Sequence, residues 1–541
     1  MYFDNPQRAT HEAAPSRQPL LPKATEDDKR RCVDPKHNMS RCGDLFSRIL
    51  FHPHSILFVL GTAAFLSTVL ALSLWIPFLC SLWSGTLSDV VKAQQCAIDN
   101  FHSDLSFLDA AVPIATDEFL ERRDRLAKAL VASGADAFVL EPGYTFQYYG
   151  NVSQPDWEPW EPEERPFLML VLPQKNESTG EVVAKTAFLA PHFEEGRVRM
   201  LGIPSRDDAE LDIVIWEEHW DPYATLMESH LFKKNSGKRQ SPSKLMMDEE
   251  IRDYISRGLA ETGFETVGLS PQVELVRQIK SPAEVELLRA VNTGTVVAVR
   301  AMRPCLVPGL TEDQVRDILD AALMSVGFGL FFNIVLFEEH GALPHGGFVT
   351  GGKKLTEESM VVIDVGAHYL GYSSDICRSF FIDPPKQRQQ FSRLGSILTK
   401  GMSLEPNHGT GSSTSAALRA EKLKVWEIVL QAQTAAAAAF QPNGTAAGVD
   451  IAARTVIEEA GYGYGFTHRL GHGIGIKAHE SPYLNKYNKK VLLQPGMTFT
   501  NEPGIYLEGK FGVRHEDIYL VKENGEAELL TGRRAKGPYD P

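Results

Sequence analysis

The sequence predicts an α+β protein with two folded units. Between residues 116 and 278, helix-like and strand-like runs alternate, which is typical of an α/β domain. Over residues 279–535, strands dominate first and two helix-rich stretches precede the last strands. A chain of 541 residues has room for two or three domains. Its 43% apolar and 23% charged residues are ordinary for a globular protein. The formal net charge of −14 argues against nucleic acid as a partner, because nucleic-acid binders usually carry a basic surface.

The N-terminal part of the chain predicts a membrane anchor. Residues 1–54 are polar and lack periodicity, so we expect a disordered cytoplasmic tail. Residues 55–83 contain no charged side chain, and a transmembrane helix needs about 20 apolar residues. Basic residues precede this run and mainly acidic residues follow it, which predicts a type II signal-anchor helix. The C-terminal part would then be luminal or extracellular, in the endomembrane system or at the cell surface. A buried core helix is the alternative for residues 55–83, and residues 84–115 are expected to form a stalk.

The first folded unit opens with an amphipathic helix from Thr116, which ends at a glycine before a short apolar strand. Further elements of this unit follow from apolar runs and their spacing. They are strands over 167–172, 186–189, 213–216 and 265–269, and a helix over 244–262.

The second unit begins at a clear helix start. Ser281, a proline and Glu284 supply an N-cap, a first-turn proline and an early acid, and the helix is expected to end near Met302. Thr311 caps a second helix in the same way. The elements expected after it are strands over 333–337, 361–365 and 379–382, a polar surface insertion over 384–415, and helices over 417–440 and 448–461.

Four acids and one histidine of the second unit carry most of the chemistry. Asp364 and Asp375 flank a glycine-containing turn, and a hairpin there would place both carboxylates side by side. Carboxylates that lie so close either share a proton or bind a cation. Each acid alone is more simply interpreted as an ordinary ion-paired carboxylate. Gathered together they need divalent metal, and one imidazole with four carboxylates suits manganese, cobalt or zinc. The five residues are Asp364, Asp375, His472, Glu502 and Glu516.

The segments around these residues match a known motif series in order. DVGAHYLGYSSDICRSF, HRLGHGIGIKAHESP, NEPGIY and VRHED resemble the motifs of the aminopeptidase P, prolidase and creatinase family, peptidase family M24. The resemblance covers roughly residues 119–521 and is specific only in its C-terminal motifs. It implies a pita-bread catalytic domain of two αββ halves over residues 279–535, preceded by a smaller creatinase-like α/β domain over residues 116–278.

The resemblance also implies a two-metal centre, with manganese favoured over cobalt or zinc. Asp375 and Glu516 would span both ions, Asp364 would bind one, and His472 with Glu502 the other.

Further roles follow from the same resemblance. Glu502 would also move the proton from the nucleophile to the leaving amine. His345 would bind substrate, His479 would steady the scissile carbonyl, and His468 would line the pocket. Arg514 and Tyr506 would orient the ligands.

The implied activity is hydrolysis of the peptide bond before proline, as an Xaa-Pro aminopeptidase or dipeptidase, by a hydroxide held between two ions. The substrates would be proline-containing peptides or a related small molecule, and homodimers are common in this family. One alternative is a lyase or small-molecule amide hydrolase on the same scaffold. Related lyases add an aspartate two places after the first, where this chain has Gly366. The other alternative is a non-catalytic binding protein.

The luminal or stalk cysteines leave two questions open. Cys377 stands where family members often have threonine, and next to a proposed ligand it is expected to be sensitive to oxidation or to bind metal. Cys96 pairs with Cys305 or with another chain, or all three remain unpaired thiols.

Overall fold

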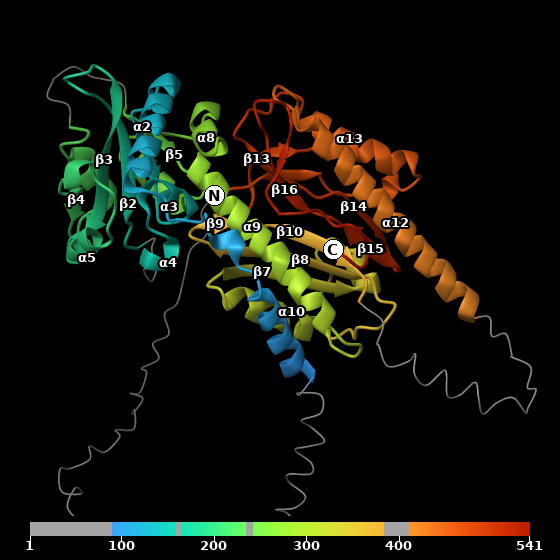
Figure 1. The fold of residues 1–541 in the computed structure, drawn as a ribbon. Helices are drawn as coiled ribbons and strands as arrows, with labels where there is room; N and C mark the ends of the chain where they lie inside the picture. Colours follow the sequence, from blue (N-terminus) through green and yellow to red (C-terminus); the bar gives the residue numbers. More distant parts are fainter. Residues whose placement is uncertain (1–88, 158–163, 234–241, 383–410) are drawn as a thin grey trace, which may run out of the picture. The chain divides into compact units, whose positions relative to one another are not determined.

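The computed structural model describes residues 89–157, 164–233, 242–382 and 411–541 (Figure 1). All of these residues belong to one compact unit, 84–541. The expected tail over residues 1–54 lies outside the described residues. Residues 384–410 of the expected polar insertion also lie outside them.

The prediction of a membrane anchor requires correction. Within the ranges given above, no helix combines the length and the apolar character needed to cross a membrane. Residues 55–83, to which the sequence assigned the crossing, lie outside the described residues. An uncharged run meets the composition of a membrane helix, but composition alone does not establish one. No described helix supports the type II membrane protein, so the signal anchor, the membrane as a partner and the luminal or extracellular placement are withdrawn.

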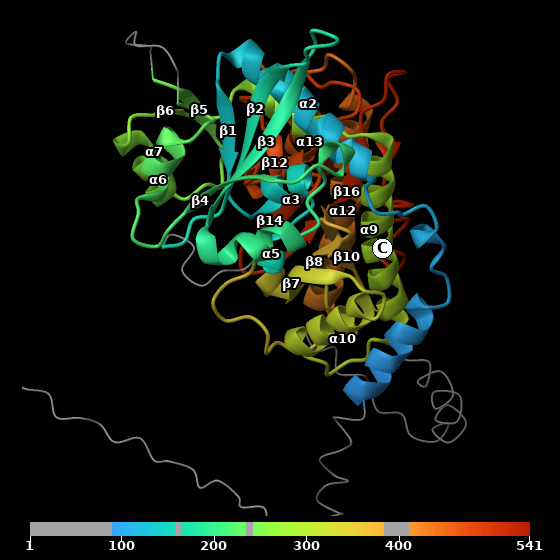
Figure 2. The ribbon, with the colours of Figure 1, turned by 90° about the vertical axis from the view of Figure 1, so that its left-hand side faces the viewer.

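The N-terminal domain, as we call residues 116–278, contains a six-stranded sheet in the order β4-β3-β2-β1-β5-β6. Strand β1 pairs antiparallel with β2 and parallel with β5, so the sheet is mixed. Helices α2 and α3 cover one face, and α6 and α7 cover the other (Figure 2). The strands are β1 (Ala137–Leu140), β2 (Leu168–Lys175), β3 (Val182–Pro191), β4 (Asp212–Trp216), β5 (Lys244–Met247) and β6 (Glu265–Val267). The helices are α2 (Thr116–Ser133), α3 (Tyr144–Gly150), α4 (Gln154–Trp157), α5 (Glu195–Met200), α6 (Pro222–Glu228), α7 (Asp253–Glu261) and α8 (Pro271–Gln278).

The helix expected over residues 244–262 is wrong in its first half. Lys244–Met247 forms β5, and only Asp253–Glu261 is helical. Successive apolar side chains of β5 point to opposite faces of the sheet, where Met246 and Leu245 enter different hydrophobic clusters. A strand buried on both faces is continuously apolar, so its sequence does not show the alternation of a half-buried strand.

The C-terminal domain, residues 279–535, starts at the predicted helix. Helix α9 (Pro282–Met302) follows Ser281, whose hydroxyl accepts from the Glu284 N–H while the Glu284 carboxylate accepts from the Ser281 N–H. Thr311 and Gln314 form the same reciprocal cap before α10 (Glu312–Met324). Each cap satisfies two N–H groups that a helix start leaves without partners. Both helix starts predicted from the sequence are confirmed.

Two sheets, each with helices on its outer side, build the rest of this domain (Figure 1). The first sheet contains β7 (Gly329–Phe337), β8 (Val361–Tyr369), β9 (Tyr372–Ser373) and β10 (Ile376–Phe380), beside α9 and α10. The second has the order β12-β11-β13-β16-β17 beside α12 (Gly411–Ala439) and α13 (Ala446–Glu459). Its strands are β11 (Gly471–Gly473), β12 (Glu480–Leu484), β13 (Thr498–Asn501), β16 (Asp517–Leu520) and β17 (Glu528–Leu529), and β14 (Gly504–Leu507) pairs with β15 (Phe511–Arg514). The α+β class is therefore confirmed.

The expected stalk contains packed structure. Residues 89–101 form a helix that buries Ala93, Ala97 and Phe101 in the cluster around α9 and α10. Cys96 on this helix forms a disulfide with Cys305, with a Cα–Cα distance of 5.9 Å. The stalk is thus corrected to a segment attached to the C-terminal domain, because its small apolar side chains at helical spacing find a complementary surface.

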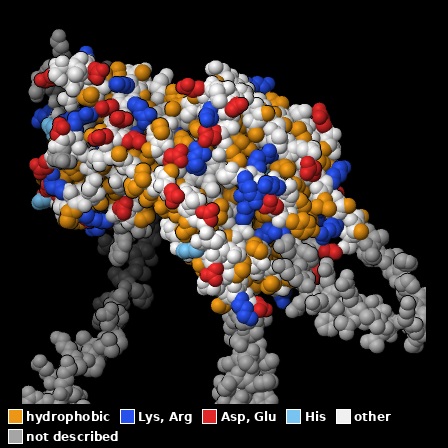
Figure 3. Space-filling model, in the orientation of Figure 1, with side chains coloured by type: hydrophobic (Ala, Val, Ile, Leu, Met, Phe, Trp, Pro, Cys, Tyr) orange, Lys and Arg blue, Asp and Glu red, His pale blue; other side chains and the backbone are white. Residues whose placement is uncertain are grey.

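Charges are distributed differently outside and inside the protein. On the face drawn in Figure 3, basic, acidic and apolar side chains are interspersed. Exposed charges remain hydrated and need no partner, whereas buried charges require one. The buried charges of the C-terminal domain are therefore the informative ones.

Replacing Cys96 and Cys305 together by serine should lower the free energy of unfolding by about 2–4 kcal/mol, because the disulfide closes a long loop in the unfolded chain. The measurement is the urea midpoint under oxidising conditions. Dithiothreitol should lower the midpoint of the wild-type chain and not that of the double variant; equal effects on both would contradict the pairing.

Candidate metal centre

The two aspartates of the first sheet lie side by side in the structure. Asp364 is on β8, and Asp375 is in the short connection between β9 and β10. Strands β8 and β10 pair antiparallel with Cys377 opposite Asp364. Both carboxylates are buried, at 6% and 4% exposure. The Asp375 N–H donates to the Asn292 side-chain carbonyl of α9 at 3.2 Å, which fixes the connection.

Glu516 reaches these aspartates from the second sheet. It lies between β15 and β16, and its N–H donates to the Cys377 carbonyl of β10 at 3.0 Å. One carboxylate oxygen from each of Asp364, Asp375 and Glu516 lies within 4.8 Å of the others. Three acids from two sheets therefore converge on one point.

His472 and Glu502 complete the cluster. The His472 Nδ1 donates to the Gly473 carbonyl at 3.0 Å, which leaves Nε2 directed at the acids. Nε2 lies 3.3 Å from the Glu502 Oε1 and 3.6 Å from the Asp375 Oδ2. The Thr500 hydroxyl accepts from the His472 N–H and donates to the Glu502 carboxylate, so one side chain positions both. A ring held by one nitrogen with the other free is the usual arrangement of a metal-binding histidine.

The protonation of the cluster reflects its crowding. Burial and repulsion from neighbouring carboxylates raise the pKa of Asp375 and of Glu516 well above the ordinary range. Burial also raises the pKa of Asp364, against the opposing effect of Arg514. On Glu502 burial acts in the same direction, but the hydrogen bond and charge of His472 outweigh it and lower the pKa to about 2. Crowded buried acids that cannot all ionise are stabilised by a cation.

The donor set fits a divalent metal. The Asp364 Oδ1 is buried and has no hydrogen-bond partner in the structure, which is unfavourable for a carboxylate unless an ion binds it. Oxygen ligands with one imidazole suit hard or borderline divalent ions. The overlapping ligand groups are Asp364 with Asp375 and Glu516, His472 with Glu502 and Glu516, and Asp375 with His472 and His479.

A chain of hydrogen bonds orients the ligands from behind. Arg514 donates to the Asp364 Oδ2, to the Pro344 carbonyl at 3.1 Å and to the Tyr506 hydroxyl at 2.6 Å. The Tyr506 hydroxyl lies 2.9 Å from the His468 Nε2. The His468 Nδ1 donates to the adjacent Arg469 carbonyl, so its Nε2 accepts from tyrosine. The positions expected to orient ligands thus contact Asp364 directly or through one neighbour.

A cavity of about 960 Å³ contains the cluster. His345, His468 and His479 line it, as the sequence predicts. The His479 Nε2 lies 3.6 Å from Asp375, and its side chain is 58% exposed. His345 is on an exposed loop after β7. Every predicted site residue therefore lies in or directly behind one cavity.

Other lining residues are absent from the sequence predictions. They include Phe331, Phe332, Arg469, Lys477 and, from the N-terminal domain, Tyr144. Phe331, Phe332 and Tyr144 lie outside the quoted motifs, in segments far apart in the chain, whereas Arg469 and Lys477 lie within HRLGHGIGIKAHESP and were not singled out there. For the phenylalanines one signal existed, since Gly366 on β8 leaves room for both rings.

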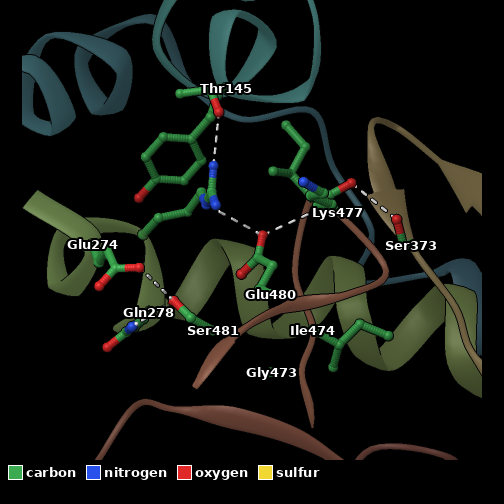
Figure 4. A network of polar contacts seen from close by, with 12 residues as sticks. Thr145, Glu274, Gln278, Ser373, Gly473, Ile474, Lys477, Glu480 and Ser481 are labelled. Atoms are coloured by element: carbon green, nitrogen blue, oxygen red, sulfur yellow. Dashed lines mark hydrogen bonds and ion pairs between the residues drawn. The ribbon is translucent and has the colours of Figure 1, made fainter. Parts of the chain in front are cut away.

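A buried ion network fixes the segment that carries His479. Figure 4 shows Glu480, which is 2% exposed, within a network of polar contacts. Its carboxylate accepts from the Lys280 Nζ at 2.8 Å and lies 3.6 Å from the Arg277 Nε. Arg277 also donates to the Thr145 hydroxyl and to the Glu249 carboxylate of the N-terminal domain, at 2.7 Å each. Glu480 therefore links the metal-site segment to the junction of both domains.

Cys377 lies in surroundings that do not support the expected reactivity. Its side chain is fully buried beside Leu336 and Val362, and burial raises the pKa of its thiol well above the usual value. A buried protonated thiol is neither a good nucleophile nor a metal ligand. The expected oxidation sensitivity is corrected accordingly.

Comparison with known proteins places this site in a family. The sequence profile of metallopeptidase family M24 matches residues 286–419 and 408–523. An uncharacterized peptidase of Schizosaccharomyces pombe is 36% identical over 480 residues, which cover 88% of this chain and 94% of that protein. The chain belongs to metallopeptidase family M24. The predicted family is thereby confirmed, and so is the prediction of a hydrolytic enzyme.

Other M24 relatives have more specific names. The probable dipeptidase PepE of Mycobacterium tuberculosis is 37% identical over 75% of this chain and 93% of its own length. The Xaa-Pro dipeptidase of Pyrococcus furiosus is 33% identical over 48% of this chain and 65% of its own. The crystal structure of dipeptidase PepE from Mycobacterium ulcerans superposes with a TM-score of 0.61 at 28% identity, covering 78% of this chain and 98% of that one. The pita-bread fold of the M24 enzymes is therefore that of this chain.

Glu480→Gln should lower the free energy of unfolding by about 3–5 kcal/mol, because Lys280 would be left as a buried cation without its counter-charge and Arg277 would keep only Glu249. Urea unfolding measures the change. Glu274→Gln is the matched control: this carboxylate accepts only a hydroxyl hydrogen bond from the neighbouring Ser481, so its loss should cost less than about 1.5 kcal/mol. A Glu480 variant no less stable than the control would contradict the network's role.

Proposed function

We propose that this M24 metallopeptidase hydrolyses the peptide bond before proline with two divalent metal ions, manganese first and cobalt or zinc as substitutes. The observation that carries the proposal is the overlap of two ligand groups at Glu516. One contains Asp364 and Asp375, and the other contains His472 and Glu502. Two groups that share a carboxylate accommodate two adjacent ions better than one.

Each site residue has a task in this reaction. The bound ions would supply a nucleophilic hydroxide and polarise the scissile carbonyl. Glu502, which lies 3.3 Å from the His472 Nε2, would accept the proton of the nucleophile and return it to the leaving amine. His479 and His345 project into the cavity where they can donate hydrogen bonds to substrate. Arg514 holds Asp364 in a fixed orientation.

The cavity wall suits proline. Phe331, Phe332, Ile334 and Leu343 contribute apolar side chains to the lining of the cavity. A proline nitrogen in a peptide bond has no N–H, so packing its ring on this wall leaves no donor unsatisfied. The Xaa-Pro dipeptidase named above supports the same specificity by similarity.

The alternative functions are less consistent with the site. A Cβ added at Gly366 would lie 2.2 Å from the Phe332 ring and 2.4 Å from the Phe331 ring. The aspartate of the related lyases therefore does not fit unless both rings move. A non-catalytic binding protein would not need the full set of ligands that converges here.

The manganese-loaded full-length chain should cleave Xaa-Pro dipeptides in preference to dipeptides without proline, and a chelator should abolish the activity. Glu502→Gln should reduce kcat by about 100-fold or more, because the proton carrier is lost, while circular dichroism shows an unchanged fold. Cleavage is followed by release of free proline. Absence of proline-dependent cleavage with manganese, cobalt and zinc alike would falsify the proposal.

Gly366→Ala should lower the free energy of unfolding by about 1–3 kcal/mol, because the new methyl group overpacks against two aromatic rings, and it should also reduce turnover by displacing the cavity wall. Gly268→Ala is the control, since a Cβ there meets no atom within 4 Å. Thermal unfolding and steady-state kinetics of both variants measure the difference. Equal behaviour of the two variants would show that the rings yield freely.

A further inference from the structure

The loop that carries His345 has little packing of its own. This segment, residues 338–351, which we call the cavity loop, follows β7, and residues 343–346 within it line the cavity. Further along the loop, Phe348 and Val349 are almost fully exposed. The position of His345 therefore depends on contacts made at the two ends of the loop.

One buried carboxylate, that of Glu312, joins both ends of the cavity loop. Glu312 is the first residue of α10 and is 1% exposed. Its Oε1 accepts from the N–H of Phe337, directly before the loop, at 2.8 Å. Its Oε2 accepts from the N–H of Gly351, the last residue of the loop, at 2.7 Å. The His340 Nδ1 lies 2.9 Å from Oε1 and 3.0 Å from Oε2, and it donates because a carboxylate can only accept.

The burial of Glu312 makes these three contacts strong. Among the described residues, its only ion-pair partner is His340. A buried carboxylate is unfavourable unless donors surround it, and hydrogen bonds to a charged group are stronger than neutral ones. Moving either end of the loop would leave part of this carboxylate without a donor. Glu312 therefore holds the two ends of the loop at fixed positions beside α10.

The conformation of the cavity loop shows that surrounding contacts impose it. Glu338, the first residue of the loop, has a φ of 54°, in the left-handed region that residues other than glycine rarely adopt. Such strain persists only where neighbouring groups hold it. Here the Glu338 N–H donates to the Met360 carbonyl at 3.0 Å, and its carboxylate accepts from the Lys422 Nζ at 2.6 Å.

The middle of the loop contacts the residues behind the metal ligands. The Pro344 carbonyl, next to His345, accepts from Arg514 at 3.1 Å, and Arg514 also donates to Asp364. The loop thus lies between two fixed groups, Glu312 at its ends and Arg514 at its centre. Loss of the first would free the loop ends without removing a proposed metal ligand.

We propose that Glu312, together with His340, is a positioning residue that sets His345 in the cavity for its contact with substrate. This inference rests on the proposed function, in which His345 donates a hydrogen bond to substrate. Neither Glu312 nor His340 is among the described residues that line the cavity, so both act through the loop. A misplacement of a substrate-binding group by about 1 Å can lower the rate about 100-fold.

Glu312→Gln tests the proposal, because it keeps the size of the side chain and replaces one accepting oxygen by an NH2 group. Either Phe337 or Gly351 then loses its acceptor. With the manganese-loaded full-length chain and alanyl-proline as substrate, kcat/KM should fall by about 10- to 100-fold. The affinity for manganese, measured by titration calorimetry, should stay within about threefold, because no proposed ligand lies on the loop. A parallel loss of metal affinity would place the effect at the metal centre and overturn the proposal.

A double variant distinguishes positioning of His345 from general damage to the fold. If Glu312 acts through His345, Glu312→Gln should change kcat/KM by less than about twofold in a chain that already carries His345→Ala, because the effects of coupled residues are not additive. Multiplication of the two separate losses in the double variant would overturn the proposal.

His340 provides a milder variant, which serves should Glu312→Gln not fold. His340→Ala leaves both backbone contacts of the carboxylate and should lower kcat/KM by about 3- to 10-fold. His340→Asn should recover most of this loss, because its amide nitrogen can take the place of Nδ1 as donor. Glu339→Gln is the matched control, since this carboxylate of the same loop is half exposed and pairs with Lys353. Equal losses in His340→Ala and Glu339→Gln, or no loss in either, would contradict the proposal.

Hydrogen exchange separates this inference from the proposed function, because it requires no turnover. Amide exchange over residues 343–351 should be about 10-fold faster in Glu312→Gln than in the wild-type chain, and unchanged in Glu339→Gln. If that holds while the wild-type chain does not cleave alanyl-proline, the positioning of the loop by Glu312 stands and the proposed function fails. Unchanged exchange in both variants overturns the positioning role whatever the activity.

Discussion

A buried guanidinium, that of Arg378 on β10, joins the two sheets of the C-terminal domain directly behind the metal ligands. It is 0% exposed and donates to the Asp517 carboxylate of β16 at 2.6 Å and to the Glu516 carbonyl. Gln433 and Thr531 donate to the same aspartate, so the pair is fully bonded on its acidic side. A buried pair is stable only when its remaining atoms find such partners. Because Arg378 donates a hydrogen bond to the backbone carbonyl of Glu516, this ligand faces the aspartates of the other sheet before any ion binds.

The crowding of the ligands follows from this connection. Asp364 and Asp375 come from one sheet and Glu502 and Glu516 from the other, and the ligand atoms of each group lie within 4.8 Å of one another. The protein partly relieves the repulsion with Arg514 and His472. The rest of the repulsion favours metal, since a divalent ion replaces several unfavourable protonations at once. The fold thus holds mutually repelling carboxylates together, and a bound metal ion would offset their repulsion.

The sequence was sufficient where the information is local. The caps at Ser281 and Thr311 depend on residues within one turn, and the ligand segments depend on short motifs, so both could be predicted. The aromatic cavity wall could not be predicted, because Phe331 and Tyr144 meet only through the fold. Strand β5 was predicted to be helical because a strand buried on both faces lacks the alternation of apolar and polar residues that marks a half-buried strand. The packed helix over residues 89–101 was missed because its complement, α9, lies about 200 residues later.

Both domains contribute residues to the cavity and its surroundings. Tyr144 reaches the cavity from the N-terminal domain, and Glu249 and Glu250 hold Lys477 at the cavity wall. The Glu480 network ties the same junction to the segment that carries His479. The N-terminal domain therefore neutralises one of the cations that line the cavity, so the charge of the cavity depends on how the two domains meet.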